Sequence, residues 1–474
     1  MIVNNLSEIK NINFFAIIIG SGPSGITTAL QLEKQKINSL IIEAGDYEPT
    51  DKNEEYLRGK IIGDKYNDLT ISRLRQFGGS SGHWGGNCNP MSHYDLNSWP
   101  IDKNNIDKYS DTAKKILNLD YKENFFLENF SDNLNTYNII WSDVRFGEKY
   151  LDHIKKSKHI YLSINTNFVN LNGDSNIIDS INCIQNKKKI KLKSKYYVLS
   201  CGGIENSRML LWSKELNKSM FDDKLPIGKY YMDHPYHEIG EGLILYETFI
   251  SYFKKINSRN IPTLTCNRVL YFSGKNKFLE KRNIKNSGLY FYFDSQNTNN
   301  IFKQVRCIAP NFIKKIYENL KVKDKYKISI ATLQEQEPKA ENKITLGLKR
   351  DPNNIPYPLI YWKKSSSEKK SAKFIAEEIS KIFIDNDIGR ISLNDYLYNN
   401  NDYETIVGNH QLGGTRIGED NRDSVVDRNL KVHGKKNLFI NGSSIFRTGG
   451  HSHPTYTIVK LAARLGDHLS ARQN

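Results

Sequence analysis

The chain has 474 residues, of which 38% are hydrophobic and 11% aromatic, so global disorder is excluded and two domains are favoured over one simple core. Its formal net charge of +16 at pH 7 leaves open an anionic substrate. Because the Lys and Arg residues are spread along the chain rather than gathered in one basic region, we expect no nucleic-acid partner.

The cysteines and the N-terminal residues indicate the cellular compartment in which we expect the protein. Five cysteines are present, an odd number, and none forms a C-x-x-C pair. This pattern argues against a disulfide framework or a zinc site and fits a reducing compartment. The N-terminal apolar run lacks the flanking features of a signal peptide, and no apolar stretch approaches the ~20 residues of a membrane span. We therefore expect a cytoplasmic protein with no transmembrane segment.

The first predicted element is a buried strand over residues 14–20, FFAIIIG. It leads into GSGPSG, in which Gly20, Gly22 and Gly25 fill the pattern G-x-G-x-x-G. A helix-type stretch and a second strand follow, and that strand ends in Glu43, 23 positions after the first glycine. This order and spacing are typical of a dinucleotide-binding fold, and they do not separate FAD from NAD.

Each residue of this motif has a physical role. Gly20 permits the tight turn, Gly22 lets the backbone approach a pyrophosphate, and Gly25 lets the helix pack close to the strand. Ser24 lies in the same turn, where the positive end of the helix favours phosphate. Glu43 would accept hydrogen bonds from the adenosine ribose hydroxyls. We therefore expect a nucleotide cofactor at this turn.

A second glycine-rich stretch, RLRQFGGSSGHWGGNCNP, covers residues 73–90. Its glycines permit turns with positive φ and close approach to a ligand, and its embedded tryptophan favours a packed loop over a solvated one. This stretch resembles the second flavin-binding signature of the glucose–methanol–choline (GMC) oxidoreductases. The segments 196–211 and 225–235, and the block 409–469, also resemble that family. The resemblance is clear over roughly 1–240 and 400–474 and thin between them.

The resemblance implies a fold, a division of the chain and a cofactor. The fold class is α/β (α+β overall), a Rossmann-type FAD-binding domain with an inserted antiparallel-sheet substrate domain, like that of p-hydroxybenzoate hydroxylase. The FAD domain would use 1–240 and 405–474, and the substrate domain 240–405. We expect strands at 288–293 and 327–334, and an amphipathic helix at 369–384, within the substrate domain.

The resemblance also implies which residues hold FAD. A histidine at the place of His83 carries the flavin covalently in some family members, and such a link is left open here but not favoured. His234 and His237 are interpreted as structural. The further implied cofactor-binding residues are Gly79, Ser80, His83, Trp84, Gly85, Asn87, Gly202, Asn441, Gly442, Pro454 and Thr455.

The C-terminal stretch GGHSHPTYT, residues 449–457, precedes a predicted final helix. His410 and His453 match the positions of the family's active-site pair. Imidazole has a pKa near neutral and suits a base that takes a hydroxyl proton, while a second imidazole can stabilise the alkoxide. We assign His410 as the base and His453 as its partner, with the roles exchangeable. His451 is interpreted as a wall or supporting group rather than a metal ligand, because no third ligand is evident.

The resemblance implies an FAD-dependent oxidoreductase that oxidises an alcohol by hydride transfer to the flavin N5. The H-W pair and the stretch 337–356 favour a sugar, glycoside or polyol as the substrate. The alternative is an FAD-containing lyase that uses the same histidine pair for acid/base chemistry. The sequence leaves open whether oxygen, a quinone or a partner protein accepts the electrons.

Overall fold

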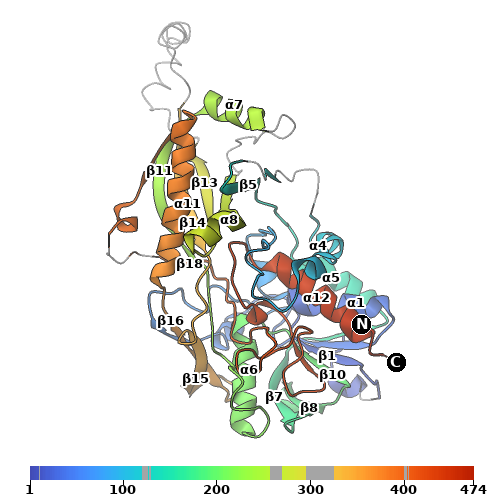
Figure 1. Ribbon diagram of the computed structural model, residues 1–474. Coiled ribbons are helices and arrows are strands. Elements are labelled where there is room, and N and C mark those ends of the chain that lie inside the picture. Colours follow the sequence, from blue (N-terminus) through green and yellow to red (C-terminus); the bar gives the residue numbers. More distant parts are fainter. Residues whose placement is uncertain are drawn as a thin grey trace.

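The computed structural model describes residues 1–9, 11–119, 126–127, 130–256, 270–294, 325–399, 403 and 405–473. The chain forms two lobes, one above the other in Figure 1, and both chain ends lie in the lower lobe. The lower lobe contains a parallel sheet with its helices, and the upper lobe contains a large antiparallel sheet. Cys266 and Cys307 lie outside the described residues, as do residues 400–402 and 404.

The lower lobe is built on a five-stranded sheet in which all strands are parallel. Its order is β19 (Leu438–Ile440), β10 (Tyr196–Leu199), β1 (Ala16–Ile19), β2 (Ser39–Ile42) and β6 (Ile160–Ser163). Every residue of β1 and β2 is buried, as expected for strands covered on both faces. On one face α1 (Pro23–Lys34) packs against α12 (Thr455–Ser470). The predicted first strand, first helix, second strand and final helix are therefore confirmed.

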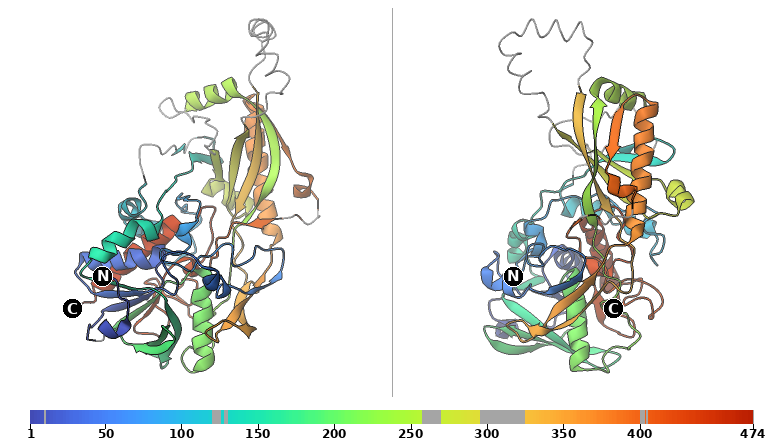
Figure 2. Two further views of the ribbon diagram at one scale, coloured as in Figure 1. Left: turned by 180° about the vertical axis from the view of Figure 1, so that it is seen from behind. Right: turned by 90° about the vertical axis from the view of Figure 1, so that its left-hand side faces the viewer.

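On the other side of this sheet lies an antiparallel meander, visible at the bottom of Figures 1 and 2. Its strands are β7 (Thr166–Gly173), β8 (Ile178–Gln185) and β9 (Lys188–Leu192). Buried Phe168, Leu171 and Ile181 of the meander belong to the same hydrophobic cluster as β1 and α12. This cluster is the core of the lower lobe.

The upper lobe is an antiparallel sheet covered on one face by α11 (Ser366–Asp385), as the right-hand view of Figure 2 shows. Its order is β17 (Gly389–Leu393), β11 (Pro235–Leu245), β14 (Lys325–Gln334), β13 (Ser287–Asp294), β12 (Leu270–Gly274), β5 (Leu134–Asn138) and β4 (Phe126–Leu127), with β18 (Ile406–Val407) beside β11. The predicted strands at 288–293 and 327–334 and the helix at 369–384 are present. The helix begins with a capping box between Ser365 and Glu368.

The register of this sheet determines which side chains lie on each of its two faces. Tyr236 pairs with Leu333, and His237 pairs with Thr332, so these pairs point to opposite faces. The face of Leu333 forms a small cluster with Tyr290 and approaches the lower lobe, while the other face lies under α11. The large sheet therefore presents tyrosine side chains toward the lower lobe.

A three-stranded sheet adds residues from the middle of the chain to the lower lobe. It contains β15 (Lys343–Arg350), β16 (Pro356–Trp362) and β3 (Lys60–Gly63), and β3 runs parallel to β16. The remaining helices are α2 (Asp51–Glu55), α3 (Lys103–Asp107), α4 (Ser110–Ile116), α5 (Phe146–Lys156), α6 (Gly203–Leu216), α7 (Tyr246–Ile256) and α8 (Asn276–Arg282). Within the ranges given above, no helix has the length and apolar character needed to cross a membrane.

Candidate active site

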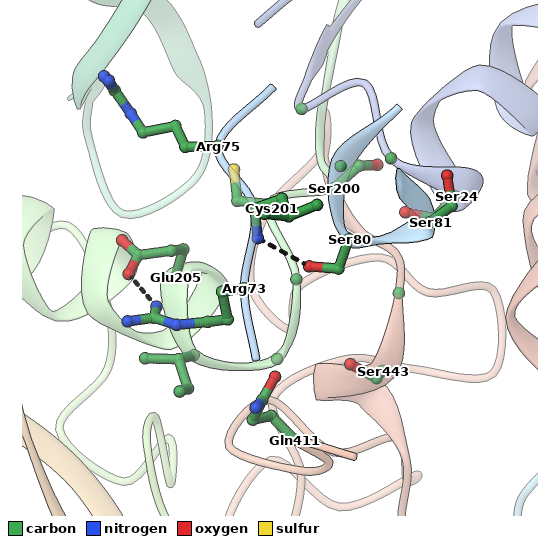
Figure 3. Close-up of a pocket in the computed structure, with 18 of the residues that line it drawn as sticks. Ser24, Arg73, Arg75, Ser80, Ser81, Ser200, Cys201, Glu205, Gln411 and Ser443 are labelled. Atoms are coloured by element: carbon green, nitrogen blue, oxygen red, sulfur yellow. Dashed lines mark hydrogen bonds and ion pairs between the residues drawn. The ribbon is translucent and has the colours of Figure 1, made fainter. Parts of the chain in front are cut away.

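A cavity of about 520 Å³ lies where β1, β2 and β10 reach their C-terminal ends. Ligands of open α/β sheets bind at this edge. Glu43, Asn167 and Phe168 line one part of the cavity, and His410 and His453 line another. Figure 3 shows a close-up of a pocket, with residues that come from segments far apart in the sequence. The cavity volume is in the range of cofactor and ligand sites.

The first glycine turn is shaped by three different requirements. Gly20 has φ +103°, and a Cβ there would lie 2.6 Å from the Ser200 carbonyl oxygen. A Cβ on Gly25 would lie 2.0 Å from the Gly20 carbonyl oxygen, so only glycine lets α1 pack this close to β1. A Cβ on Gly22 would meet nothing within 4 Å, and Gly22 lines the cavity. The turn thus leaves backbone open to a ligand directly before the positive end of α1.

Glu43 follows β2 and lines the same part of the cavity. Its carboxylate accepts hydrogen bonds from the Ser21 amide at 3.0 Å, from the Ser21 hydroxyl at 2.7 Å and from the Gly45 amide at 2.8 Å. A carboxylate has about four acceptor sites, so this arrangement fixes the side chain and leaves room for one more donor. Its bond to a ribose hydroxyl stays a prediction.

The second glycine-rich stretch closes over the first. The turn η2 (Gly79–Gly82) passes so close to the first motif that a Cβ on Gly79 would lie 3.1 Å from the Cα of Gly22. The Ser80 hydroxyl accepts a hydrogen bond from the Leu74 amide at 3.1 Å, the dashed line beside Ser80 in Figure 3. Trp84 is partly buried and donates from its indole to the Val144 carbonyl at 2.9 Å. The expectation of a packed loop is confirmed.

His83 has an exposed side chain at the lining of the cavity. Partial burial lowers the pKa of its imidazole, and the positive charge of Arg145 lowers this pKa further. A backbone hydrogen bond with Ser72 acts in the opposite direction and raises the pKa. Its imidazole is therefore favoured in the neutral form, with a ring nitrogen free of a proton.

Most of the predicted cofactor residues line the cavity. Two do not: Gly25 packs against Gly20, and buried Asn441 bonds to Thr28 and to the Gly442 amide. Ser200, labelled in Figure 3, lines the cavity and has a buried hydroxyl without a hydrogen-bond partner in the described part of the chain. The lining residues among those predicted are Gly20, Gly22, Ser24, Glu43, Gly79, Ser80, His83, Trp84, Gly85, Asn87, Gly202, Gly442, Pro454 and Thr455.

The two predicted catalytic histidines meet at the cavity. The ring centroids of His410 and His453 are 4.5 Å apart, and the ring planes are inclined by 71°. His410 lies in the loop after β18, and His453 lies directly before Pro454, the cap of α12. The His453 Nδ1 is buried and has no hydrogen-bond partner in the described part of the chain. The pair therefore contains a buried ring nitrogen whose hydrogen-bonding capacity is unused by the described residues.

Burial keeps both imidazoles neutral. It lowers the pKa of His453 to about 3, and the neighbouring His234 lowers it further. It also lowers the pKa of His410 well below its usual value, with added repulsion from His453 and His234. A neutral imidazole has one nitrogen lone pair and one N–H, so each ring can accept one proton and donate one hydrogen bond.

His234 supports His410 from behind the cavity. The Nδ1 atoms of the two rings are 2.8 Å apart. One oxygen of buried Asp233 accepts from the amides of both residues, at 2.7 Å for His234 and 2.8 Å for His410. Burial raises the pKa of Asp233 to about 7, while the Tyr66 hydroxyl and these two amides act in the opposite direction. His234, which we interpreted from the sequence as a structural residue, therefore lies directly against a predicted catalytic residue.

The model of a protein family described as GMC oxidoreductase matches residues 338–462. This stretch contains His410 and His453.

Residues 338–462 therefore match the GMC oxidoreductase family.

Two curated relatives match parts of this chain. The fructose dehydrogenase large subunit of Gluconobacter japonicus is 28% identical over 157 residues, which are 33% of this chain and 27% of the relative. The 2-methyl-1,2-propanediol dehydrogenase of Mycolicibacterium austroafricanum is 40% identical over 65 residues, 14% of this chain and 12% of the relative. The matches thus span about a quarter and an eighth of the length of these relatives.

Solved structures share the fold over nearly the whole length. Pyridoxine 4-oxidase from Mesorbium loti has a TM-score of 0.58 and 13% identity, with 96% of this chain and 99% of that chain covered. A formate oxidase has a TM-score of 0.58 and 15% identity, with 97% and 98% covered. The predicted α/β fold class is therefore confirmed.

The cavity also contains charged residues that the sequence did not single out. Arg73 pairs with Glu205 at 2.7 Å, as Figure 3 shows, and Arg208 pairs with Asp351 at 2.7 Å. All four line the cavity. Arg73 and Glu205 are 132 positions apart, so no local spacing could have linked them. These ion pairs fix the wall of the cavity through side chains from separate elements.

His451 lies outside the cavity lining and is 2% exposed. Its Nδ1 is 2.9 Å from Asp95 Oδ2 and 2.9 Å from the Asn286 side-chain nitrogen, and its ring stacks on Tyr271 at 5.7 Å between centroids. These contacts fit the interpretation of His451 as a supporting group. They do not fit its interpretation as part of the cavity wall. Among the described residues no group of three or more His, Cys, Asp and Glu side chains could hold a metal ion.

Proposed function

We propose that this protein is a GMC oxidoreductase that binds FAD and oxidises an alcohol group of a sugar, glycoside or polyol. The observation that carries the proposal is the pair of neutral imidazoles, 4.5 Å apart, in a cavity that also contains the glycine turn before α1. The names of the two curated relatives refer to a sugar and a diol, which supports this substrate class.

The residues of the cavity fit FAD. Gly22 and the start of α1 would hold the pyrophosphate, and Glu43 would hold the ribose hydroxyls. The unpaired Ser200 hydroxyl and the backbone around Gly79 would contact other polar atoms of the cofactor. When bound, FAD supplies the acceptor for the hydride that leaves the carbinol carbon. We favour non-covalent binding over attachment through His83.

The histidine pair would accept the hydroxyl proton and stabilise the oxygen from which it leaves. His410 accepts this proton, because its depressed pKa leaves it neutral and ready to act as a base near pH 7. His453 holds the hydroxyl oxygen and stabilises negative charge as the proton leaves. Since α12 begins at Thr455, directly after this pair, its positive end adds to that stabilisation.

The division into an FAD domain of residues 1–240 and 405–474 and a substrate domain of 240–405 is part of the proposal. It is supported by the parallel sheet, which uses β1, β2, β6, β10 and β19, and by the antiparallel sheet, which takes most of its strands from the middle of the chain. The strand β11 begins at Pro235, and β5 joins the antiparallel sheet from an earlier segment.

The test is the absorbance spectrum of the purified protein before and after anaerobic addition of sugars and polyols. Loss of the flavin absorbance with one alcohol is expected and would define the substrate class. A flavin spectrum that no alcohol changes would favour the lyase. Absence of flavin, even after incubation with FAD, would overturn the proposal. Acid precipitation should release the flavin into solution, whereas flavin in the pellet would indicate attachment at His83.

A further inference from the structure

His234 is fully buried between the His410 ring and the backbone of the C-terminal loop. Its Nδ1 lies 2.8 Å from the His410 Nδ1, and its Nε2 lies 3.2 Å from the Gly449 carbonyl oxygen. These two partners lie on opposite sides of the ring, and the backbone of Gly450, next to Gly449, also faces it.

These partners determine where the protons are. A carbonyl oxygen can only accept a hydrogen bond, so the His234 Nε2 must carry a proton. Burial lowers the pKa of His234 to about 4, so the ring is neutral near pH 7 and has only this proton. The His234 Nδ1 is therefore an acceptor.

The same reasoning then applies to His410. Its Nδ1 faces an acceptor at 2.8 Å and must donate. Since burial keeps His410 neutral, its Nε2 has no proton and presents a lone pair on the opposite side of the ring. This is the tautomer in which Nε2 can act as a base.

We propose that His234 is a positioning residue that holds His410 in the Nδ1–H tautomer and so leaves Nε2 free to take the substrate proton. Asp233 supports this arrangement, because one of its carboxylate oxygens holds the amides of both histidines and fixes the two backbones relative to each other. The tautomer itself follows from the contacts and from the burial that keeps both rings neutral, whereas its use as a base rests on the proposed function.

The direct test is nuclear magnetic resonance of the holoenzyme labelled with ¹⁵N-histidine. The chemical shifts and couplings of the ring nitrogens distinguish Nδ1–H from Nε2–H, and the signal that is lost in His410→Gln identifies His410. We expect the Nδ1–H form for His410 and the Nε2–H form for His234. A His410 ring protonated at Nε2 would overturn the inference, whether or not the protein oxidises alcohols.

Two variants test the role of the acceptor. His234→Asn places an amide oxygen close to the position of Nδ1, whereas His234→Leu fills the space and accepts nothing. We expect His234→Leu to lose the Nδ1–H preference and to slow cofactor reduction by roughly 10²-fold, with KM for the alcohol little changed. His234→Asn should recover most of both effects.

His237→Phe is the matched control, because it removes another buried histidine of the same segment that does not line the cavity. It should leave the His410 signal unchanged. Equal loss of rate in His234→Leu, His234→Asn and His237→Phe would show a merely structural role. If His410 has the expected tautomer but no alcohol reduces the flavin, the proposed function is contradicted and the inference about the tautomer still holds.

Discussion

The two parts of the cavity are built by opposite means. The part around the glycine turn takes its main groups from one continuous stretch, from the end of β1 to Glu43, and it exposes backbone rather than side chains. The histidine part brings together His234, His410 and His453, and the first two are 176 positions apart. A local pattern can specify the first arrangement, but the second exists only after both lobes have folded.

The largest expected effect concerns the glycine turn. Gly25→Ala would place a Cβ 2.0 Å from a backbone oxygen, so α1 must move away from β1 and we expect loss of FAD binding and of the folded lower lobe. Gly22→Ala is the matched change, since its Cβ meets nothing of the protein within 4 Å. It should fold normally and bind FAD more weakly. Circular dichroism and flavin titration measure both, and equal stability of the two variants would contradict the packing role of Gly25.

The next effect concerns the histidine part. His410→Ala should slow anaerobic flavin reduction by about 10²- to 10⁴-fold, because the proposed base is lost, while the flavin stays bound. His453→Asn should be less damaging, since an amide can still donate to the substrate oxygen. Stopped-flow absorbance gives the two rates. If His453→Asn were the slower variant, the roles of the two residues would have to be exchanged.

A third effect concerns the support behind the loop of His453. Asp95 is 1% exposed and faces His451. Burial raises its pKa, but the nearby His451 and hydrogen bonds from Ser92 outweigh burial and bring the pKa to about 2. Asp95→Asn should therefore destabilise the fold by ~3 kcal/mol, because His451 loses its carboxylate. Urea unfolding measures this change, and Asp223→Asn, at an exposed pair with Lys214, should cause none.

The smallest effect is a dependence of stability on pH. The buried His237 ring has both nitrogens without partners among the described residues. Burial lowers its pKa to about 3, helped by the charge of Lys364, whereas the unfolded value is about 6.5. Between these values the unfolded chain binds the extra proton, so the free energy of unfolding falls by up to about 1.4 kcal/mol for each pH unit as the pH decreases.

His237→Phe lacks this titration and should lose less stability than the native chain between about pH 7 and about pH 5. Urea unfolding of both proteins at several pH values gives the difference. Parallel pH profiles would show that His237 does not titrate on unfolding. The other buried histidines contribute equally to both proteins, so they cancel in this comparison.

The sequence predicts the shape of the glycine turn, because the packing and φ requirements at Gly20, Gly22 and Gly25 depend on a few consecutive residues. It placed His410 and His453 at one site only through a family resemblance, and the structure then brings them within 4.5 Å. It could not find the contact between His234 and His410, because that contact depends on how β11 and the loop after β18 meet. The partners of His451 were missed for the same reason.

The glycine loop before α12 has a consequence for how the molecule unfolds. Gly449 bonds to His234 at the start of β11, His451 bonds to Asn286 beside β13, and Pro454 caps α12, which packs against α1 in the lower lobe. Because one short segment is anchored in both lobes, neither lobe can melt without releasing contacts of the other. The described parts of the chain should therefore lose their structure in one cooperative transition, and an upper lobe taken from another protein would have to supply its own partner for His451.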